Sequence, residues 1–306
     1  MLHLRLVVPA DTAAAVREVL LASPAVCHVV HLPGAAIDPV ADVLTAEVAR
    51  EAASALFGRL RGLGLEQNGS ISAGEVAVVL SDRARAAERA APGLGTDAVV
   101  WEEVESRTTE ESTLSATYLV FMTVATMIAG IGLLLDQPIL IVGAMVVGPE
   151  FGPMAGFCVG VVQGRWSEAK RSLIALLVGF PIGMALTAGL VLMLTAAGQL
   201  DRSMLTASRP DTAFIYQPDV LSFVVAFLAG VAGMMSLTAA KSGALVGVLI
   251  SVTTVPAAAN VAVALAYWHP AEARGSALQL ALNLLGIALA GTLTLVVQRH
   301  AWRRHT

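Results

Sequence analysis

Long apolar stretches fill the last two thirds of the chain, and their lengths predict six membrane-spanning segments. A helix needs about 20 consecutive apolar residues to cross a bilayer core. Segments at least this long occur at 114–135, 138–164, 172–198, 218–240, 242–268 and 277–298. The pattern therefore predicts an α-helical polytopic membrane domain over residues 114–298.

The first eighty residues have a different pattern, in which short alternating runs are separated by helical periodicity. The alternation predicts strands at 2–8, 26–32, 40–46 and 70–80, with helices at 12–22 and 47–63. The order β-α-β-β-α-β is that of a ferredoxin-like domain. We expect this α+β domain over 1–80, a linker and acidic juxtamembrane segment over 81–113, and a basic tail over 299–306.

Composition and charge agree with this division. The chain is 56% hydrophobic and 14% charged, with a mean hydropathy of +0.74, whereas soluble proteins carry about 25% charged residues. Residues 1–113 have a net charge of −7, and an acidic soluble part argues against nucleic acid as a partner. The two cysteines fall one in each part, so a disulfide framework is not expected.

Basic residues in the loops predict the orientation. With residues 1–80 in the cytoplasm, the cytoplasmic loops and tail hold seven Lys and Arg residues and the outer loops hold three. Cytoplasmic loops carry the excess of positive charge in membrane proteins. We expect both termini on the cytoplasmic side, with the lipid bilayer as partner.

One acid stands inside the second apolar stretch. Glu150 is part of the run Gly148-Pro149-Glu150-Phe151-Gly152-Pro153. Prolines and glycines interrupt a helix, and non-helical backbone at membrane depth is tolerated where protein or a water-filled cavity satisfies it. A carboxylate at that depth is costly and points to function. The alternative is a protonated structural glutamate bonded to a neighbouring helix.

A shift of 104 residues aligns the two halves of the membrane domain, with 8 identities in 52 positions over 142–193. Three spans per half would make the halves an inverted repeat, and broken helices at matching positions are typical of transporters. The shift places Pro149-Glu150 opposite Thr253-Thr254, where Pro256 would break the fifth span.

The predicted midplane site gathers residues from both breaks, and its ligand would be a cation or a polar substrate. Its members are Pro149, Glu150, Gly152, Pro153, Ser251, Thr253, Thr254 and Asn260. Lys241 is a candidate counter-charge, or an anchor whose ammonium reaches the interface. In the alternative interpretation, the hydroxyls only bond between helices or to backbone freed by Pro256.

The run from Val142 to Pro153 also carries a resemblance. Together with Gly230-Val231-Ala232-Gly233 and the run Ser242-Gly243-Ala244-Leu245-Val246-Gly247-Val248, it resembles a bacterial and archaeal membrane family known only as an uncharacterised hydrophobic domain, a domain of unknown function. The resemblance covers roughly residues 97–297. It implies the cytoplasmic, or inner, membrane of a bacterium or archaeon, and no assigned biochemistry.

The sequence favours a transporter or channel for a small ion or solute, gated by the N-terminal domain. The alternative is a membrane-anchored sensor whose ferredoxin-like domain binds a ligand or partner. An enzyme is not expected, because the chain has no His-Glu-x-x-His motif, no Ser/His pair at membrane depth and no second deep carboxylate to form an acid dyad. No cofactor or metal is expected either, since His28 and His31 would face opposite sides of a strand. Spans rich in small residues predict a homo-oligomer, either a dimer or a trimer.

Overall fold

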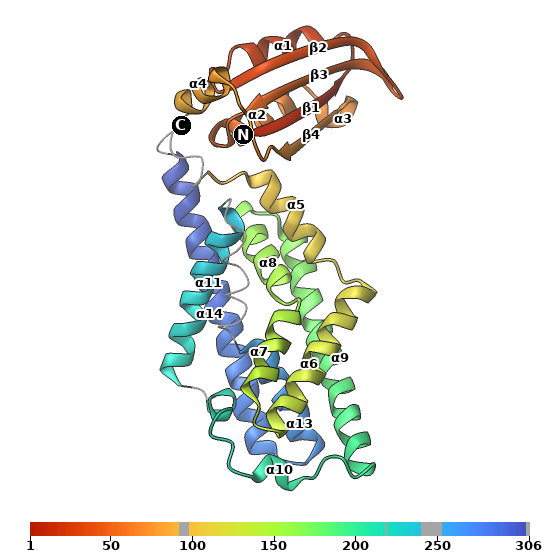
Figure 1. Ribbon diagram of the computed structural model, residues 1–306, viewed down its shortest axis with the longest axis vertical. Helices are drawn as coiled ribbons and strands as arrows, with labels where there is room; N and C mark the ends of the chain where they lie inside the picture. The colour runs from red at the N-terminus through yellow and green to blue at the C-terminus, as the bar shows by residue number, and fades with distance from the viewer. Residues whose placement is uncertain (92–97, 218, 240–252, 304–306) are drawn as a thin grey trace. The chain divides into compact units, whose positions relative to one another are not determined.

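The computed structural model describes residues 1–91, 98–217, 219–239 and 253–303, with side chains up to residue 300. The chain divides into two compact units (Figure 1). The first consists mainly of Met1–Glu103, and the second of Val104–Leu237 with Lys241–His300. Each unit is described by itself.

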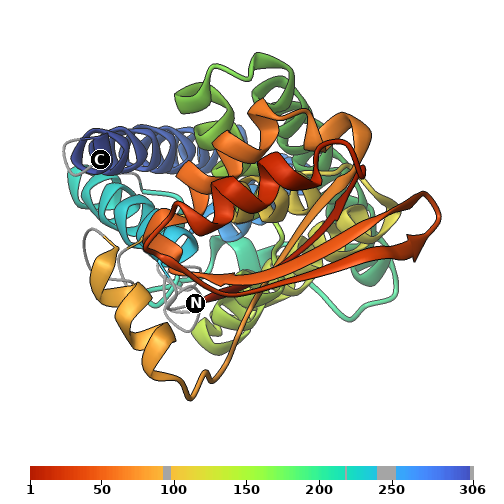
Figure 2. The ribbon, with the colours of Figure 1, turned by 90° about the horizontal axis from the view of Figure 1, so that it is seen from above.

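The N-terminal unit contains a four-stranded antiparallel sheet. Its strands are β1 (Leu2–Val8), β2 (Val26–Ile37), β3 (Val40–Val48) and β4 (Ser70–Glu75), in the order β2-β3-β1-β4. Helix α1 (Ala13–Leu21) joins β1 to β2, while α2 (Arg50–Gly62) and the short α3 (Leu65–Asn68) join β3 to β4. The elements thus follow the predicted order. Strand β2 is longer than predicted, and its hairpin with β3 extends past the helices (Figure 2).

The two faces of this sheet differ. Alternation along β1 buries Leu2, Leu4 and Leu6, which join α1 and α2 in one apolar core. His3 and Arg5 point to the other face and are exposed. Helix α4 (Asp82–Ala90), capped by the Ser81 hydroxyl, packs on β2 at that second face. The second face of the sheet is therefore the more polar of the two.

The second unit is helical. It comprises α5 (Trp101–Glu111), which begins at the unit boundary, α6 (Ala116–Leu134), α7 (Pro138–Val147), α8 (Phe151–Gln163), α9 (Trp166–Ala196), α10 (Ser203–Thr206), the 3-10 turn η2 (Ala213–Ile215), α11 (Val220–Thr238), α13 (Thr254–Ala266) and α14 (Pro270–Arg303). Four of these helices, α6, α9, α11 and α14, are long and apolar enough to cross a membrane. A fifth span results when the bent pair α7 and α8 is taken as one.

The predicted fifth span, 242–268, is described only in part. Helix α13 is apolar but only 13 residues long, which is about 20 Å and too short to cross a bilayer. Residues 240–252, which precede it, lie outside the described residues. The described structure therefore has four or five candidate spans rather than the predicted six.

Small residues allow close helix packing in the second unit. Gly179 on α9 lies against the ring of Tyr118 on α6, and Gly130 on α6 lies against Thr187 on α9. In the same way Gly230 on α11 lies against Ile287 on α14, and these two helices run side by side (Figure 1). A larger side chain at any of these glycines would push the helices apart.

Candidate functional site

The second apolar stretch is broken where the sequence predicts it. Helices α7 and α8 meet at an angle of 49°, with Gly148, Pro149 and Glu150 between them. Gly148 has extended backbone (φ −61°, ψ 128°), and Pro149 offers no N–H to continue the helix. Glu150 is the N-cap residue of α8.

The Glu150 side chain does not cap its own helix. An acid at the N-cap usually accepts a hydrogen bond from the N–H of the second or third helical residue. The third residue here is Pro153, which has no N–H. The carboxylate instead reaches α13, where the Thr254 hydroxyl donates to Glu150 Oε1 over 2.7 Å. Because Pro153 offers no N–H, the Glu150 side chain has less reason to fold back onto α8 and points to another helix instead.

Both members of this pair are buried. Glu150 is 5% exposed and Thr254 is 1% exposed. Glu150 Oε2 lies over Gly148, where even a Cβ atom would collide with it. Among the described residues, Oε2 has neither a hydrogen-bond partner nor an ion pair. One oxygen of the carboxylate is therefore bonded and the other is open to a further ligand or proton.

Two helix N-termini meet at this carboxylate. Glu150 begins α8, and Thr254 is the first residue of α13, each helix being 13 residues long. The positive ends of helix dipoles stabilise a nearby negative charge. They offset part of the cost of burying the carboxylate, although no basic side chain of the described residues pairs with it.

A second polar group faces the same region from α6. The Tyr118 hydroxyl is buried, has no hydrogen-bond partner among the described residues, and lies within electrostatic range of Glu150. Sequence inspection alone gave Tyr118 no role. The only hint in the sequence was a tyrosine near the start of an apolar helix.

Thr253 takes part in a different contact from its neighbour Thr254. Its hydroxyl accepts a hydrogen bond from Asn283 Nδ2 over 3.0 Å, and Gln279 donates to Asn283 Oδ1 over 3.3 Å. These side chains border a pocket of about 280 Å³. The pocket is lined by Phe214, Asp219, Leu221, Ser222, Val225, Ala226, Thr253, Gln279 and Asn283.

Asn260 lies apart from this group. Six residues beyond Thr254, it is about 9 Å further along α13. Its Nδ2 donates to Glu272 Oε1 over 2.9 Å and to Ser276 Oγ over 2.8 Å. Glu272 also pairs with the buried Arg209 over 2.6 Å. The structure therefore places Asn260 in a network that ties the loop before α11 to the start of α14.

The remaining predicted residues separate into two groups. Gly152 and Pro153 are buried in the first turn of α8, where Gly152 lies against the Glu111 side chain. Ser251 and Lys241, the predicted hydroxyl ligand and the candidate counter-charge, lie outside the described residues. The structure thus brings together Pro149, Glu150 and Thr254, with Thr253 directly beside them in the chain.

One signal in the sequence was missed. Glycine recurs every fourth residue at positions 148, 152, 156, 160 and 164. The middle three lie on one face of α8, where Gly156 meets the Ser112 and Ser172 hydroxyls and Gly160 meets the backbone of Ala169. This row lets α8 approach α9 and the end of α5 closely, and so fixes the helix that carries Glu150.

Part of the helical unit matches a known family model. Residues 145–289 match the family described as "Domain of unknown function (DUF389)". The predicted resemblance to a family of unknown function is confirmed. The DUF389 region contains the α7–α8 break, Glu150 and Thr254, and it excludes the N-terminal unit.

A curated relative matches more weakly. It is an uncharacterized protein of Methanocaldococcus jannaschii, 23% identical over 195 residues, which are 63% of this chain and 57% of that protein. The matched part is thus less than two thirds of the relative's length. No solved structure matches the chain significantly.

Proposed function

We propose that the protein is a membrane transporter or channel for a small cation, for protons or for a small polar solute, with its site at the break that carries Glu150. The observation that carries the proposal is the buried carboxylate, one oxygen of which is bonded to Thr254 while the other has no partner among the described residues. A buried charge without a partner is very costly. Binding a cation or a proton at Oε2 removes that cost.

Six spans in two inverted halves would suit this function. The 104-residue shift maps Ala116–Leu134 (α6) onto Val220–Thr238 (α11), and it maps Trp166, the first residue of α9, onto Pro270, the first residue of α14. Helix α8 maps onto α13 within one residue at each end. This agreement of bounds supports a duplication far better than 8 identities do.

The turns before the last helix of each half are also alike. Gly164 has φ +75° and Trp268, 104 residues later, has φ +61°. The N–H of Arg165 bonds to the Gly160 carbonyl over 2.8 Å, and the N–H of His269 bonds to the Ala264 carbonyl over 2.8 Å. Left-handed backbone is uncommon outside glycine, so a tryptophan that repeats it supports a shared backbone plan.

Side-chain contacts repeat as well. Thr126 meets Gly183 between α6 and α9, and Gly230 meets Ile287 at the equivalent positions of α11 and α14. In each contact one partner is glycine, which lies on α9 in the first half and on α11 in the second. The two positions are in contact in both halves although their residues differ.

Glu150 and Thr254 are themselves equivalent positions, since they are 104 residues apart and in contact. In a two-fold arrangement, equivalent residues touch only near the symmetry axis. The contact therefore supports a site at the interface of the two halves, which is where transporters with inverted repeats bind their substrates.

The two halves differ in the side chains that lie near that interface. In the first half, Tyr118 packs on Gly179. At the equivalent positions of the second half, Ser222 and Asn283 line the 280 Å³ pocket together with Thr253. Replacement of a ring by a hydroxyl leaves a largely apolar space with a few polar groups, which lies between the Asp219 end of α11 and Thr253, the residue before α13. We infer that this space is the access route to Glu150.

The N-terminal unit would regulate the membrane part. The sheet order β2-β3-β1-β4, with all pairings antiparallel and two helices on one face, supports a ferredoxin-like domain. Such a domain binds ligands in many proteins, although fold alone decides no function. The loop charges favour both termini in the cytoplasm, and the small residues of the spans favour a homo-oligomer.

Flux into proteoliposomes tests the proposal. Purified protein is reconstituted, and influx of protons, monovalent and divalent cations and small polar metabolites is measured. We expect flux of one class of solute, lost in Glu150→Gln and kept in Asp136→Asn, whose acid bonds to Thr212 away from the break. Absence of flux across the whole panel, or equal flux in wild type and Glu150→Gln, contradicts the proposal.

The access route has its own test in the same assay. Ser222→Tyr should fill the pocket as Tyr118 fills the equivalent space, and lower the flux strongly. Leu228→Tyr, on the same helix at a position 61% exposed in the structure, is the control and should leave the flux unchanged. Unchanged flux in Ser222→Tyr would place the route elsewhere.

A further inference from the structure

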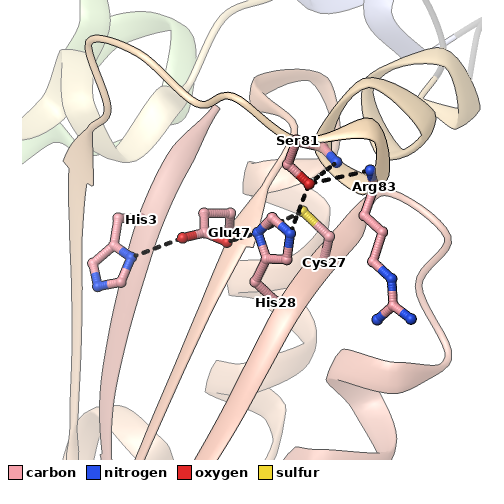
Figure 3. A network of polar contacts seen from close by, with 7 residues as sticks. His3, Cys27, His28, Glu47, Ser81 and Arg83 are labelled. Carbon is pink, nitrogen blue, oxygen red and sulfur yellow. Dashed lines mark hydrogen bonds and ion pairs between the residues drawn. The ribbon is translucent and has the colours of Figure 1, made fainter.

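A cluster of sulfur, nitrogen and oxygen donors lies on the second face of the N-terminal sheet. It consists of Cys27 on β2, the next residue His28, and Glu47 on β3, whose ligand atoms lie within 4.8 Å of one another. Figure 3 shows the three side chains converging, with His3 beside them. No part of the proposed membrane site uses this cluster.

Strand register places three of these residues in one row. Cys27 is the direct partner of Glu47 on β3, and Glu47 is in turn the direct partner of His3 on β1. Directly opposed residues in antiparallel strands project to the same face. Three neighbouring strands thus present a thiol, a carboxylate and an imidazole side by side.

His28 joins them through an irregularity of β2. In a regular strand, adjacent side chains point to opposite faces, so Cys27 and His28 would diverge. Here the register shifts between Cys27 and Val30, and His28 has φ +51°. Left-handed backbone in a non-glycine residue is unusual and gathers at functional sites. The irregularity brings the imidazole to the side of the thiol.

The donors lie close together and are joined directly, so an ion would replace the proton between His28 and Glu47 and move the two side chains slightly apart. His28 Nδ1 lies 2.5 Å from Glu47 Oε2 and 3.8 Å from Cys27 Sγ. On the far side of the same carboxylate, His3 Nδ1 lies 3.6 Å from Glu47 Oε1. Cys27 is 9% exposed, while the side chains of His28 and Glu47 are 34% and 20% exposed. The cluster is therefore partly enclosed but open to an ion from solvent.

The other ring nitrogen of His28 is already oriented. Nε2 lies 2.9 Å from the Ser81 hydroxyl oxygen, which accepts hydrogen bonds from the backbone N–H groups of Arg83 and Ala84 at the start of α4. In the structure as it stands, the 2.5 Å contact places a ring proton between Nδ1 and Glu47. A metal on Nδ1 would displace that proton, and Nε2 would then carry the ring proton beside Ser81. Metal-binding histidines in general have their second nitrogen held by such a partner. In Figure 3 the Arg83 side chain extends away from the cluster, so its cation does not occupy it.

We propose that Cys27, His28 and Glu47 form a binding site for a divalent transition metal of the Zn²⁺ type, with water as the fourth ligand. A donor set of one thiolate, one imidazole and one carboxylate suits tetrahedral Zn²⁺ and does not suit Mg²⁺ or Ca²⁺, which prefer oxygen alone. Burial raises the pKa of the Cys27 thiol, and Glu47 raises it further. A bound dication reverses both effects, because it favours the thiolate and neutralises the carboxylate.

Cobalt substitution in the full chain tests the site. The purified protein in detergent is treated with a chelator, dialysed, and titrated with Co²⁺. We expect a thiolate-to-cobalt charge-transfer band and the strong visible bands of tetrahedral Co²⁺, both removed by added Zn²⁺. Cys27→Ser should abolish the charge-transfer band, and Ser81→Ala should weaken Co²⁺ binding about 10- to 100-fold.

Two matched controls are available in the chain. Cys158→Ser removes the other cysteine, which is buried in α8. His31→Gln removes a second histidine of β2, which pairs with Asp42 over 2.8 Å instead. Both should keep the band. Absence of the band in the wild type, or its survival in Cys27→Ser, overturns the proposal.

A measurement on the wild type alone covers the case in which Cys27→Ser does not fold. The alkylation rate of each cysteine is followed by mass spectrometry with and without Zn²⁺. Zn²⁺ should slow the labelling of Cys27 at least tenfold and leave that of Cys158 unchanged. An unchanged rate at Cys27 rejects the site.

Discussion

Thr254 donates a hydrogen bond of 2.7 Å to Glu150 Oε1, and these two residues, each at the start of a 13-residue helix, are 104 positions apart in the chain. The contact joins two helices that are each too short to cross a membrane alone. It also leaves Glu150 Oε2 without a partner among the described residues. The stability and the chemistry of the break therefore depend on the same pair.

Replacing Thr254 tests this dependence. Thr254→Val keeps the size of the side chain but removes the donor, so the buried carboxylate loses its hydrogen bond. Hydrogen bonds to charged groups contribute about 1.5–3 kcal/mol. We expect a loss of this order in unfolding free energy, measured by denaturant titration in detergent micelles.

The control is Thr187→Val. Thr187 is equally buried and bonds to the Thr126 hydroxyl over 3.0 Å, with no acid involved. A neutral hydrogen bond contributes about 0.5–1.5 kcal/mol, so this loss should be smaller. Equal losses of unfolding free energy in the two variants would mean that the hydrogen bond from Thr254 to Glu150 contributes no more than a neutral one.

The glycine row on α8 predicts position-dependent effects of alanine. A Cβ atom at Gly160 would lie 2.7 Å from the Ala169 nitrogen, and rigid backbone cannot move aside. Gly160→Ala should destabilise the fold by about 1–3 kcal/mol through overpacking. Thermal unfolding of the purified protein, followed by circular dichroism, measures the effect.

Gly189→Ala is the matched control for this row. Gly189 also lies within a long apolar helix, α9, but a Cβ atom there would have no neighbour within 4 Å. Alanine favours a helix over glycine, so this variant should be neutral or slightly more stable. If both variants behave alike, close approach of α8 and α9 does not determine stability.

The ion pair of Arg209 and Glu272 is buried, whereas the ion pair made by Glu168, the residue equivalent to Glu272 in the first half, is more exposed. Arg209 is 4% exposed, and its guanidinium also lies 5.0 Å from the centre of the Tyr216 ring. Glu272→Gln leaves this cation without its acid, which should cost about 3–5 kcal/mol. Adding Arg209→Met to that variant should recover most of the loss in unfolding free energy.

Glu168 provides the comparison, because it stands 104 residues earlier and pairs with Arg165 over 2.8 Å. The Arg165 side chain is 40% exposed, and exposed pairs contribute only about 0–1 kcal/mol. Glu168→Gln should therefore be nearly neutral. A cost for Glu168→Gln as large as that for Glu272→Gln would contradict the role given to burial.

Asp42 predicts a pH effect in the β2–β3 hairpin. The Gly34 N–H donates to Asp42 Oδ1 over 2.8 Å, and this bond, together with His31, holds the pKa of Asp42 below its usual range. A lowered pKa means that the stabilisation is present above the ordinary value of about 3.9 and is lost as the pH falls through the folded value. Hydrogen exchange at the Gly34 amide, corrected for its intrinsic pH dependence, should therefore accelerate below about pH 4. Asp42→Asn should remove this acceleration; its persistence would assign the effect to another group.

Much of the fold could be predicted from the sequence, because apolar length and alternation decide where elements form. The break at Pro149 and Glu150 was predicted from chemistry that any helix must obey. The beginnings of α9 and α14 were placed too late, since charged residues such as Glu168 and Glu272 extend a helix beyond the apolar core without adding to its apolar length. Hydropathy alone cannot detect such turns.

The contacts of the site were harder to predict. The 104-residue shift correctly placed Thr254 beside Glu150, but Asn260 contacts Glu272 and Ser276 instead. Side-chain pairing depends on how α13 packs against α14, which spacing along one helix does not determine. The cluster of Cys27, His28 and Glu47 was missed for a similar reason, since it depends on cross-strand register and on a left-handed residue that alternation would not predict.

The most direct test of the central claim is the melting temperature of wild type and Glu150→Gln in detergent, across pH and a panel of monovalent and divalent cations. A ligand that binds only the folded state raises the melting temperature. We predict that one cation, or protons, raises it in the wild type and that the response disappears in Glu150→Gln. An identical response in both proteins would contradict a cation or proton site at Glu150 and leave the residue a structural partner of Thr254.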